Sequence, residues 1–421
     1  MAYAGAQLGS QAANLILAAK GVIEKQFNEE SWVWNKLRKE RGFPVEKAGK
    51  HYQTKFAHIL RKPGNIGAFM AETASIPAAT EVTVQQSTIT LKLYVRPIAV
   101  TGMAEKLVSK RDPYTFAEVW RTEMEGAVSA AIRDISIQLW GNGDGILAKT
   151  AADPGTGDNF TASTTAPMNG AHYLHVGDKI QFYNPSTGAA RSGGPYTITS
   201  ISGTTVRVTP NIDNSVASGD AVGIYGQGVT GSGATSYTIT GLQRIINDAT
   251  GAATIQGLSR STYPEAEAIV DSSTSTREPT PQLITWMMQR IEQASGDTVD
   301  TIVAHPAVRQ RYADLLFGQR QYTSASFDEG IEQLTVAAFG QRVKFEADRY
   351  APWNSIYFIN WGKLKAFVAK DLGEEAEQWM ESYYAKQRLL TMIMELGATK
   401  FRSHGVLKNI NQADASVYMP L

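Results

Sequence analysis

The sequence of 421 residues contains no cysteine. Disulfide bonds, thiolate metal sites and a cysteine nucleophile are therefore excluded, and nothing in the composition requires an oxidising compartment. The chain also lacks a net charge, because 40 Lys and Arg balance 40 Asp and Glu. A dedicated polyanion binder normally carries an excess of basic residues, so we expect any contact with nucleic acid to be local and weak.

Long hydrophobic runs are missing as well. The apolar stretch that begins at Leu15 ends at Lys20, whereas a membrane-spanning helix needs about 20 apolar residues. The first ten residues lack the basic segment that opens a secretory signal. We therefore expect a protein that is cytosolic when made and that has no membrane partner.

Motifs that mark common enzymes are absent from the sequence. We find no Gly-x-Ser-x-Gly, no phosphate-binding loop and no His-Glu-x-x-His pair. His172 and His175 lie three residues apart in a Gly- and Asn-rich segment, and we interpret them as exposed loop residues. The sequence predicts no catalytic residue, no metal and no cofactor.

Two acidic segments have a simpler interpretation than chemistry. The segment from Asn142 to Gly145 lacks the alternating ligands and the distal Glu of a calcium loop, so we interpret it as a turn. The run of Glu374, Glu375 and Glu377 is typical of a solvated helix start, where acidic residues are favoured by the helix dipole.

The N-terminal region has an amphipathic pattern between residues 11 and 27. Its apolar residues recur at steps of three and four, which predicts a helix; they are Leu15, Ile16, Ala19, Val22, Ile23 and Phe27. Trp32, Trp34 and Leu37 follow within a charged segment. We interpret Phe27, Trp32 and Trp34 as anchors that bury either in a neighbouring subunit or beneath their own domain.

Residues His51 to Gly102 have the pattern of an extended arm. Apolar and polar residues alternate from His51 to Phe56 and again from Ile89 to Arg96, on either side of the glycine-rich segment Gly64 to Gly67. This period of two predicts strands with one apolar face. A two-stranded ribbon alone is marginally stable in water, so we expect the arm to find its missing burial only on other copies of the chain, and we infer assembly rather than catalysis.

A long helix is predicted from Asp112 to Trp140. Asp112 is placed as the N-cap and Pro113 as the first helical residue. An apolar stripe continues along the helix; it comprises Phe116, Trp120, Ala127, Val128, Ala131, Ile135 and Leu139. The glycine-rich segment from Gly141 ends the helix.

Composition divides the remaining chain. From about Thr150 to Thr240, short alternating runs are separated by Gly, Pro and Asn, which predicts a small β-barrel or sandwich inserted into a continuous flanking domain. Mixed α/β character returns after Gly241, with helices beginning at Pro281 and Pro306. The predicted strands there span 299–304, 343–345, 356–359 and 364–369, and a final extended run spans 383–401.

The order of these parts resembles the major capsid (coat) protein of tailed bacteriophages, which has the Hong Kong 97 type of fold. Local sequence supports the resemblance at three places: Leu139-Trp-Gly-Asn-Gly-Asp-Gly145 after the long helix, Val299-Asp-Thr-Ile-Val-Ala-His-Pro306 before a helix, and Phe327-Asp-Glu-Gly330 leading to Gly340-Gln-Arg-Val343 and Tyr357-Phe-Ile-Asn360.

The resemblance implies an α+β fold with an N-terminal arm, an extended β-loop, a spine helix, peripheral and axial domains, and an inserted all-β domain. The implied bounds are 1–50 for the arm, 51–102 for the extended loop, 103–149 and 372–421 for the peripheral domain with its spine helix, 150–240 for the inserted domain and 241–371 for the axial domain.

The resemblance also implies a function: self-assembly into the icosahedral shell that encloses the double-stranded DNA of a tailed phage, in the virion. Implied partners are the chain itself as hexamers and pentamers, a separate scaffolding protein, a portal, a decoration protein and, weakly, the packaged DNA. We expect intersubunit contacts from the charged residues Lys55, Arg61, Lys62, Glu72, Lys92 and Arg96.

Two other functions remain open at this point. A non-viral encapsulating shell uses the same fold, and a gene for a cargo enzyme beside this gene would indicate it. The Gly-, Ser-, Thr- and Tyr-rich region 150–240 also fits a glycan-binding adhesive protein, although the missing signal peptide argues against secretion.

Overall fold

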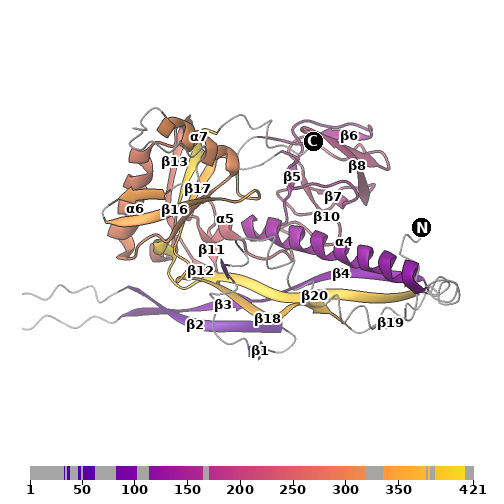
Figure 1. Ribbon diagram of the computed structural model, residues 1–421, viewed down its shortest axis with the longest axis horizontal. Helices are drawn as coiled ribbons and strands as arrows, with labels where there is room; N and C mark the ends of the chain where they lie inside the picture. The colour runs from indigo at the N-terminus through magenta and orange to yellow at the C-terminus, as the bar shows by residue number, and fades with distance from the viewer. Residues whose placement is uncertain are drawn as a thin grey trace, which may run out of the picture.

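A single long helix, α4 (Pro113–Trp140), lies at the centre of the molecule. The computed structural model describes residues 33, 36–37, 46–48, 51–61, 82–101, 113–164, 170–317, 335–338, 340–375, 378–379 and 385–412. A long sheet lies on one side of α4, and two further bodies, an axial domain and a β-barrel, stand on the other side (Figure 1).

Helix α4 follows the sequence prediction closely. Pro113 is its first residue, and Val128, Ile132, Ile135 and Leu139 form a buried stripe at steps of three and four. The side chains of Phe116 and Trp120 lie outside the described residues. The helix ends where the Gly141 N–H donates to the Gln138 carbonyl at 3.0 Å.

The long sheet beneath α4 is built around one long strand, β20. It comprises β18 (Leu364–Glu374), β20 (Ala385–Ala398), β19 (Gln378–Trp379) and β4 (Lys92–Thr101). Strand β20 pairs antiparallel with β18 and β19 on one edge and with β4 on the other. Its alternate residues Leu390, Met392, Met394 and Leu396 are buried in the main core.

The acidic run at the end of β18 is not a helix start, so that expectation was wrong. Glu374 is the last residue of the strand, and the Glu375 carboxylate accepts hydrogen bonds from Lys370 and from the Thr391 hydroxyl. The strand extends beyond its apolar residues because β20 supplies hydrogen-bond partners along its full length. Glu377 lies outside the described residues.

The axial domain contains a six-stranded sheet in the order β13-β21-β17-β14-β16-β15. Its strands are β13 (Ile269–Arg277), β14 (Thr301–Ala304), β15 (Thr335–Ala338), β16 (Gln341–Ala347), β17 (Ser355–Ile359) and β21 (Gly405–Ile410). All five residues of β17 are buried. Ile356 and Phe358 pack into a second core on one face of the sheet, whereas Tyr357 and Ile359 pack into the main core on the other face. This sheet therefore separates two cores.

Helices α6 (Pro281–Ser295) and α7 (Pro306–Phe317) begin at the predicted prolines. The Thr280 hydroxyl accepts a hydrogen bond from the Leu283 N–H at 3.3 Å and so caps the start of α6. Gly296 ends α6 in the left-handed conformation, with φ of 72°.

The inserted β-domain is a closed barrel. Its sheet has the order β5-β10-β7-β8-β9-β6, and the strands are β5 (Ala148–Lys149), β6 (Asn159–Thr161), β7 (Lys179–Tyr183), β8 (Tyr196–Ser202), β9 (Thr205–Thr209) and β10 (Ala221–Ile224). A bridge between Thr150 and Ala162 joins the first strand to the last, supported by the hydrogen bond from the Ser163 N–H to the Lys149 carbonyl at 2.7 Å. Closure removes the exposed sheet edges.

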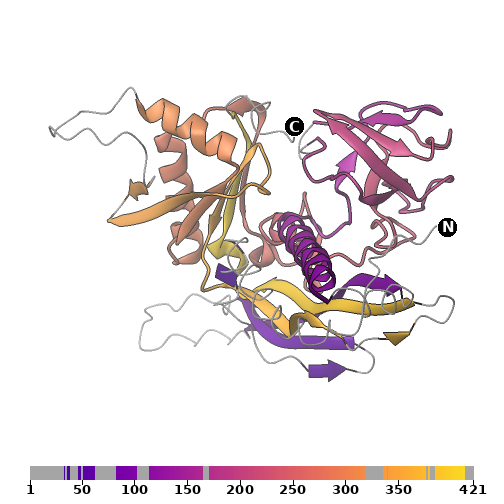
Figure 2. The same cartoon turned by 45° about the vertical axis from the view of Figure 1, so that its right-hand side comes forward.

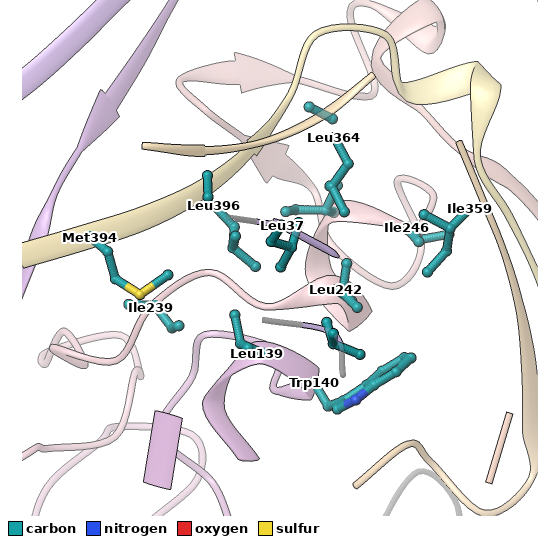
Figure 3. Close-up of a cluster of buried hydrophobic side chains, with 14 of the residues drawn as sticks. Leu37, Leu139, Trp140, Ile239, Leu242, Ile246, Ile359, Leu364, Met394 and Leu396 are labelled. Carbon is teal, nitrogen blue, oxygen red and sulfur yellow. The ribbon is translucent and has the colours of Figure 1, made fainter. Parts of the chain in front are cut away.

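The main core lies where α4, β20 and the axial sheet meet (Figures 2 and 3). Trp140 is 1% exposed and packs edge-on against Tyr357 at 5.1 Å between ring centroids. Val33 and Leu37, more than a hundred residues earlier than Leu139 in the sequence, are buried in the same core. The neighbouring anchors Trp32 and Trp34, and also Phe27, lie outside the described residues.

Short elements between the barrel and the axial sheet complete this core. They are α5 (Leu242–Ile245), β11 (Thr254–Ile255), β12 (Leu258–Ser259), the 3-10 turn η1 (Pro264–Ala266) and, after β20, the 3-10 turn η2 (Phe401–Ser403).

Strand pairing differs from the expected domain bounds at three places. Strand β4 pairs with β20 rather than with the arm, so the extended loop does not reach residue 102. Strand β21 inserts between β13 and β17, so the axial sheet includes residues from the expected peripheral range. Strand β18 crosses the expected boundary at residue 371. A strand's alternation shows that it has a buried face but not which sheet it joins.

Arg260 organises the short elements from the inside. It is 0% exposed, and its guanidinium donates to the carbonyls of Ala266, Ala252, Arg244 and Ile245 at 2.8–3.1 Å. Burial lowers its pKa to about 10. One side chain thus provides hydrogen-bond donors for carbonyls from three separate segments. The sequence did not reveal this role of Arg260.

We predict that Arg260→Met lowers the free energy of unfolding by about 3–5 kcal/mol, because four backbone carbonyls inside the protein lose their hydrogen-bond donor. A urea titration followed by circular dichroism measures the change. Arg290→Met is the matched control: Arg290 is exposed on α6, and its loss should change stability by less than about 0.5 kcal/mol. Equal effects of the two substitutions would contradict the prediction.

Candidate assembly surface

The predicted arm is a β-hairpin that extends from the long sheet (Figure 1). Strand β2 (His51–Arg61) pairs antiparallel with β3 (Thr83–Thr90), and β1 (Glu46–Ala48) adds a short strand to the outer edge of β2. Pairing runs from Gln53 opposite Thr90 to Arg61 opposite Thr83, with one irregularity after Ile59.

The root of the hairpin is anchored on its own chain. Ile89 and Leu91 are 3% and 8% exposed and pack with Phe367 of β18, together with Phe56. The His58 ring lies 5.8 Å from Phe401, while the Thr88 N–H donates to the Gln256 carbonyl at 3.0 Å. The arm therefore finds part of its burial within the subunit, contrary to the inference that other subunits supply all of it.

Burial decreases along the hairpin away from this root. Val84 in β3 is 51% exposed and Val82, just before the strand, is 43% exposed. Within the described part of the chain, no apolar cluster includes either residue. Two branched apolar side chains on an extended strand leave apolar surface that burial against another molecule would stabilise.

Strand β4 provides a second exposed apolar surface. Its residues Tyr94 and Ile98 face α4 and the main core, while Leu93 and Val95 on the opposite face are 59% and 43% exposed. Leu93 lies opposite Ile393 of β20. Beyond β20, no strand among the described residues pairs with β4, so β4 is an edge strand with an apolar outer face, a common template for association.

The sequence placed Ile89, Leu91, Leu93 and Val95 on one apolar face of one strand. The structure divides this run at Leu91, between β3 and β4, so the first two residues are buried at the arm root and the last two are exposed on another sheet. Alternation alone could not show this division, because Leu91 interrupts the pairing without any Gly or Pro nearby.

A polar network fixes β4 to the spine helix and to the barrel. The Asp134 carboxylate on α4 accepts hydrogen bonds from the Tyr94 hydroxyl and from Arg96, both at 3.0 Å, and from Arg133 at 3.1 Å. Arg133 also donates to Asp178, before β7 of the barrel, at 3.0 Å. Burial raises the pKa of Asp134, and the positive charges of Arg133 and Arg96 oppose that rise.

The predicted contact residues fall into three groups. Lys55 is exposed on β2, on the side of the hairpin opposite the buried Thr54. Lys62 and Glu72 lie outside the described residues, as does the side chain of Arg61. Lys92 lies on β4, and Arg96 is engaged by Asp134 of its own chain, a partner that the sequence did not predict. Contacts of these residues with neighbouring subunits remain predictions.

The two histidines expected in an exposed loop are partly buried, so that expectation was wrong. His172 packs against His305, Tyr350 and Trp353 of the axial domain, and burial lowers the pKa of His175 to about 4. The Gly- and Asn-rich composition suggested exposure, but the tertiary structure places this segment between two domains.

Other kinds of site find little support. Within the described ranges, no three His, Asp or Glu side chains are grouped closely enough to hold a metal ion. No helix in that part of the chain is both long and apolar enough to cross a membrane. The features that stand out are the exposed apolar surfaces of the arm and of β4.

We predict that Asp134→Asn lowers the free energy of unfolding by about 3 kcal/mol, since two arginines and a buried tyrosine lose a charged acceptor. Thermal unfolding followed by circular dichroism measures the loss. Asp153→Asn is the control, because Asp153 is exposed and accepts a hydrogen bond from the nearby Gly155 N–H. If Asp134→Asn left the free energy of unfolding unchanged, the network would not stabilise the subunit.

Comparisons with known proteins agree with this architecture. Residues 221–386, from the last barrel strand into β20, match the family model described as SU10 major capsid protein. No curated protein sequence shows a significant match. The solved capsid asymmetric unit of cyanophage A-1(L) aligns with a TM-score of 0.50 at 12% identity, covering 88% of this chain and 94% of that chain.

Two further structures align less well. The capsid of the native GTA particle aligns with a TM-score of 0.43 at 10% identity, covering 89% of this chain and 90% of that chain. The encapsulin complex of Synechococcus elongatus aligns with a TM-score of 0.38 at 9% identity, covering 78% of each chain. Both alignments lie below a TM-score of 0.5, so we draw no argument from them.

The cyanophage likeness shows the fold over most of the chain, and the family match covers residues 221–386. Both findings agree with the α+β architecture. The predicted resemblance is confirmed at the level of the fold, which is similar to that of a phage capsid protein, and residues 221–386 are similar to the SU10 major capsid protein family.

Proposed function

We propose that copies of this chain assemble, through the arm and the outer face of β4, into the icosahedral shell that encloses double-stranded DNA in the virion. The observation that carries the proposal is the pair of exposed apolar surfaces: Val82 and Val84 on the arm, and Leu93 and Val95 on β4. The capsid-protein match on residues 221–386 supports it independently.

The two surfaces suit contact between copies because they lie apart on each subunit. The arm carries its apolar residues beyond its own root, while β4 presents its residues on the body. A surface that meets a different surface on the next copy is a heterologous contact, and such contacts propagate around rings. Hexamers and pentamers are rings of this kind, so we propose them as the assembly units.

Each contact is modest, and many together make a lattice. Burying the exposed parts of Leu93 and Val95 contributes about 1 kcal/mol per residue at about 25 cal/mol per Å². Contacts that one subunit makes with several neighbours act together, because the first contact raises the effective concentration for the others. Charged residues such as Lys55 then fix which copy meets which, more than they add affinity.

We also propose the partners that such a shell needs. A separate scaffolding protein, a portal, a decoration protein and assembly in the host cytoplasm are consistent with a shell protein of this type, and the same match supports a structural rather than catalytic role. The closed barrel, which has its own core, is the surface that we assign to a decoration partner.

We predict that Leu93→Lys combined with Val95→Lys abolishes particles while leaving the subunit folded, because charges cannot be buried in the apolar contact. Electron microscopy and size-exclusion chromatography measure particle yield, and circular dichroism measures folding. Val176→Lys is the control, since Val176 is 62% exposed but lies on the barrel. Unchanged yield in the double variant would overturn the proposed contact.

The neutral charge balance suits the wall of a DNA container. A strongly cationic wall would bind phosphates tightly and hinder both packaging and release. With 40 basic and 40 acidic residues, we infer that contact with the packaged DNA is weak and does not depend on base sequence.

Filter binding at low salt tests this inference directly. We expect weak retention of duplex DNA that decreases further as salt is added and that is equal for unrelated duplexes, because only phosphates are contacted. A duplex whose retention exceeds that of a scrambled control of the same length would contradict the inference.

A further inference from the structure

Three of the six histidines meet at the seam between the barrel and the axial domain. His172 and His175 precede strand β7 of the barrel, and His305 lies between β14 and α7. The rings of His172 and His305 are 5.7 Å apart and nearly perpendicular. The Trp353 ring lies 5.9 Å from both of these rings, so His172, His305 and Trp353 form one cluster across the seam.

Hydrogen bonds across the seam hold the rings in place. The His172 Nε2 lies 2.6 Å from the Arg349 carbonyl, and because a carbonyl only accepts, this nitrogen carries the proton. The Tyr173 hydroxyl donates to the Tyr350 carbonyl at 2.8 Å. Both bonds run from the barrel to one axial segment, 349–350, which joins the two domains.

The same geometry holds the histidines neutral. Within the described residues, the Nδ1 atoms of His172 and His175 are buried without a hydrogen-bond partner. The His305 Nδ1 accepts from the Ala307 N–H at 3.2 Å in the first turn of α7. A second proton on His172 would be buried without an acceptor, and a proton on His305 Nδ1 would break the bond that begins α7.

The charges that face the seam do not balance added protons. From the axial segment, the Arg349 side chain is cationic, and the Asp348 carboxylate is turned to the Tyr350 N–H at 2.9 Å. From α4, Arg133 is paired with Asp134 and with Asp178. Asp178 is the nearest carboxylate to His175, at 4.0 Å from its Nδ1. The other titratable groups facing the cluster are Tyr173, Tyr350 and Tyr357.

We propose that this seam is an acid-sensitive hinge: protonation of His172, His175 and His305 releases the barrel from the axial domain while both domains stay folded. Each domain has its own core, so the hinge can open without unfolding either of them. The proposal does not depend on how copies assemble, because every group belongs to one chain.

The sign of the pH effect follows from burial. Burial lowers the pKa of His172, of His175 to about 4 and of His305 to about 3. In the open seam these rings are solvated and titrate near 6.5. The open state therefore binds more protons below that pH, so the closed seam is fully favoured above 6.5 and is progressively lost as the pH falls.

The size of the effect can be bounded. Between pH 7.5 and 5.5, His175 and His305 each raise the ratio of open to closed seam about tenfold, or about a hundredfold together. Burial raises the pKa of Asp134 and of Asp348, so their protonation favours the closed seam. The hundredfold figure for this pair is therefore an upper limit.

Hydrogen exchange of the full chain, read by mass spectrometry, tests the hinge. The reporters are amides of the two segments that meet at the seam, those of His175, Tyr350 and Ala351, each hydrogen-bonded within its own segment, and the reference amides are those of β14 in the axial core. After correction for intrinsic rates, we expect exchange at the seam to rise on the order of a hundredfold from pH 7.5 to pH 5.5, while β14 stays protected.

Variants identify the groups responsible. His172→Gln keeps a donor for the Arg349 carbonyl, and His305→Asn keeps an acceptor for the Ala307 N–H; together they should reduce the pH effect at least tenfold. His58→Gln is the matched control, because His58 is a buried histidine at the arm root, and it should leave the effect unchanged.

Three results would overturn the hinge. The first is equal seam exchange at both pH values in the unmodified chain. The second is β14 opening together with the seam, which would mean global acid unfolding. The third is an undiminished pH effect in the His172→Gln, His305→Asn protein. The first two results are measured on the unmodified chain, so they test the proposal even if the variants misfold.

Discussion

The packing of helix α4 against strand β20 is the interaction on which the rest of the structure depends. One stripe of α4 and the alternate residues of β20 form the main core, which Leu37, α5 and one face of the axial sheet complete. Because β20 also pairs with β4 and β18, this contact fixes the long sheet. The barrel follows α4 directly in sequence, and the polar network around Asp134 ties it to the same helix.

The arm shows how one element can serve both folding and assembly. Its root is buried on β18 and beside Phe401, so its direction is set before any partner arrives. Its outer part keeps apolar residues exposed. A prepositioned arm loses less conformational entropy on binding than a free one, which is the benefit of preorganisation for association. The expectation that the arm depends wholly on other copies is therefore replaced by a division between root and outer part.

The barrel is held to the body by two kinds of contact at different places. An ion pair, Arg133 with Asp178, joins it to α4, while uncharged hydrogen bonds and aromatic rings join it to the axial segment at residues 349–353. The ion pair contains no histidine, whereas the aromatic seam contains the histidines themselves. A domain attached in this way can change its angle to the body without leaving it.

The sequence by itself determined where α4, α6 and α7 begin and the kind of fold. Pro113, Pro281 and Pro306 mark helix starts because proline suits the first helical turn, and the glycine-rich alternating runs indicated the inserted β-domain. Only the tertiary structure decided that β4 leaves the arm at Leu91, that β21 joins the axial sheet, that Arg260 is buried among carbonyls, and that His172 and His175 lie in a seam. The reason is physical: periodicity reports one buried face of a segment, but the surface that buries it comes from residues far away in the chain.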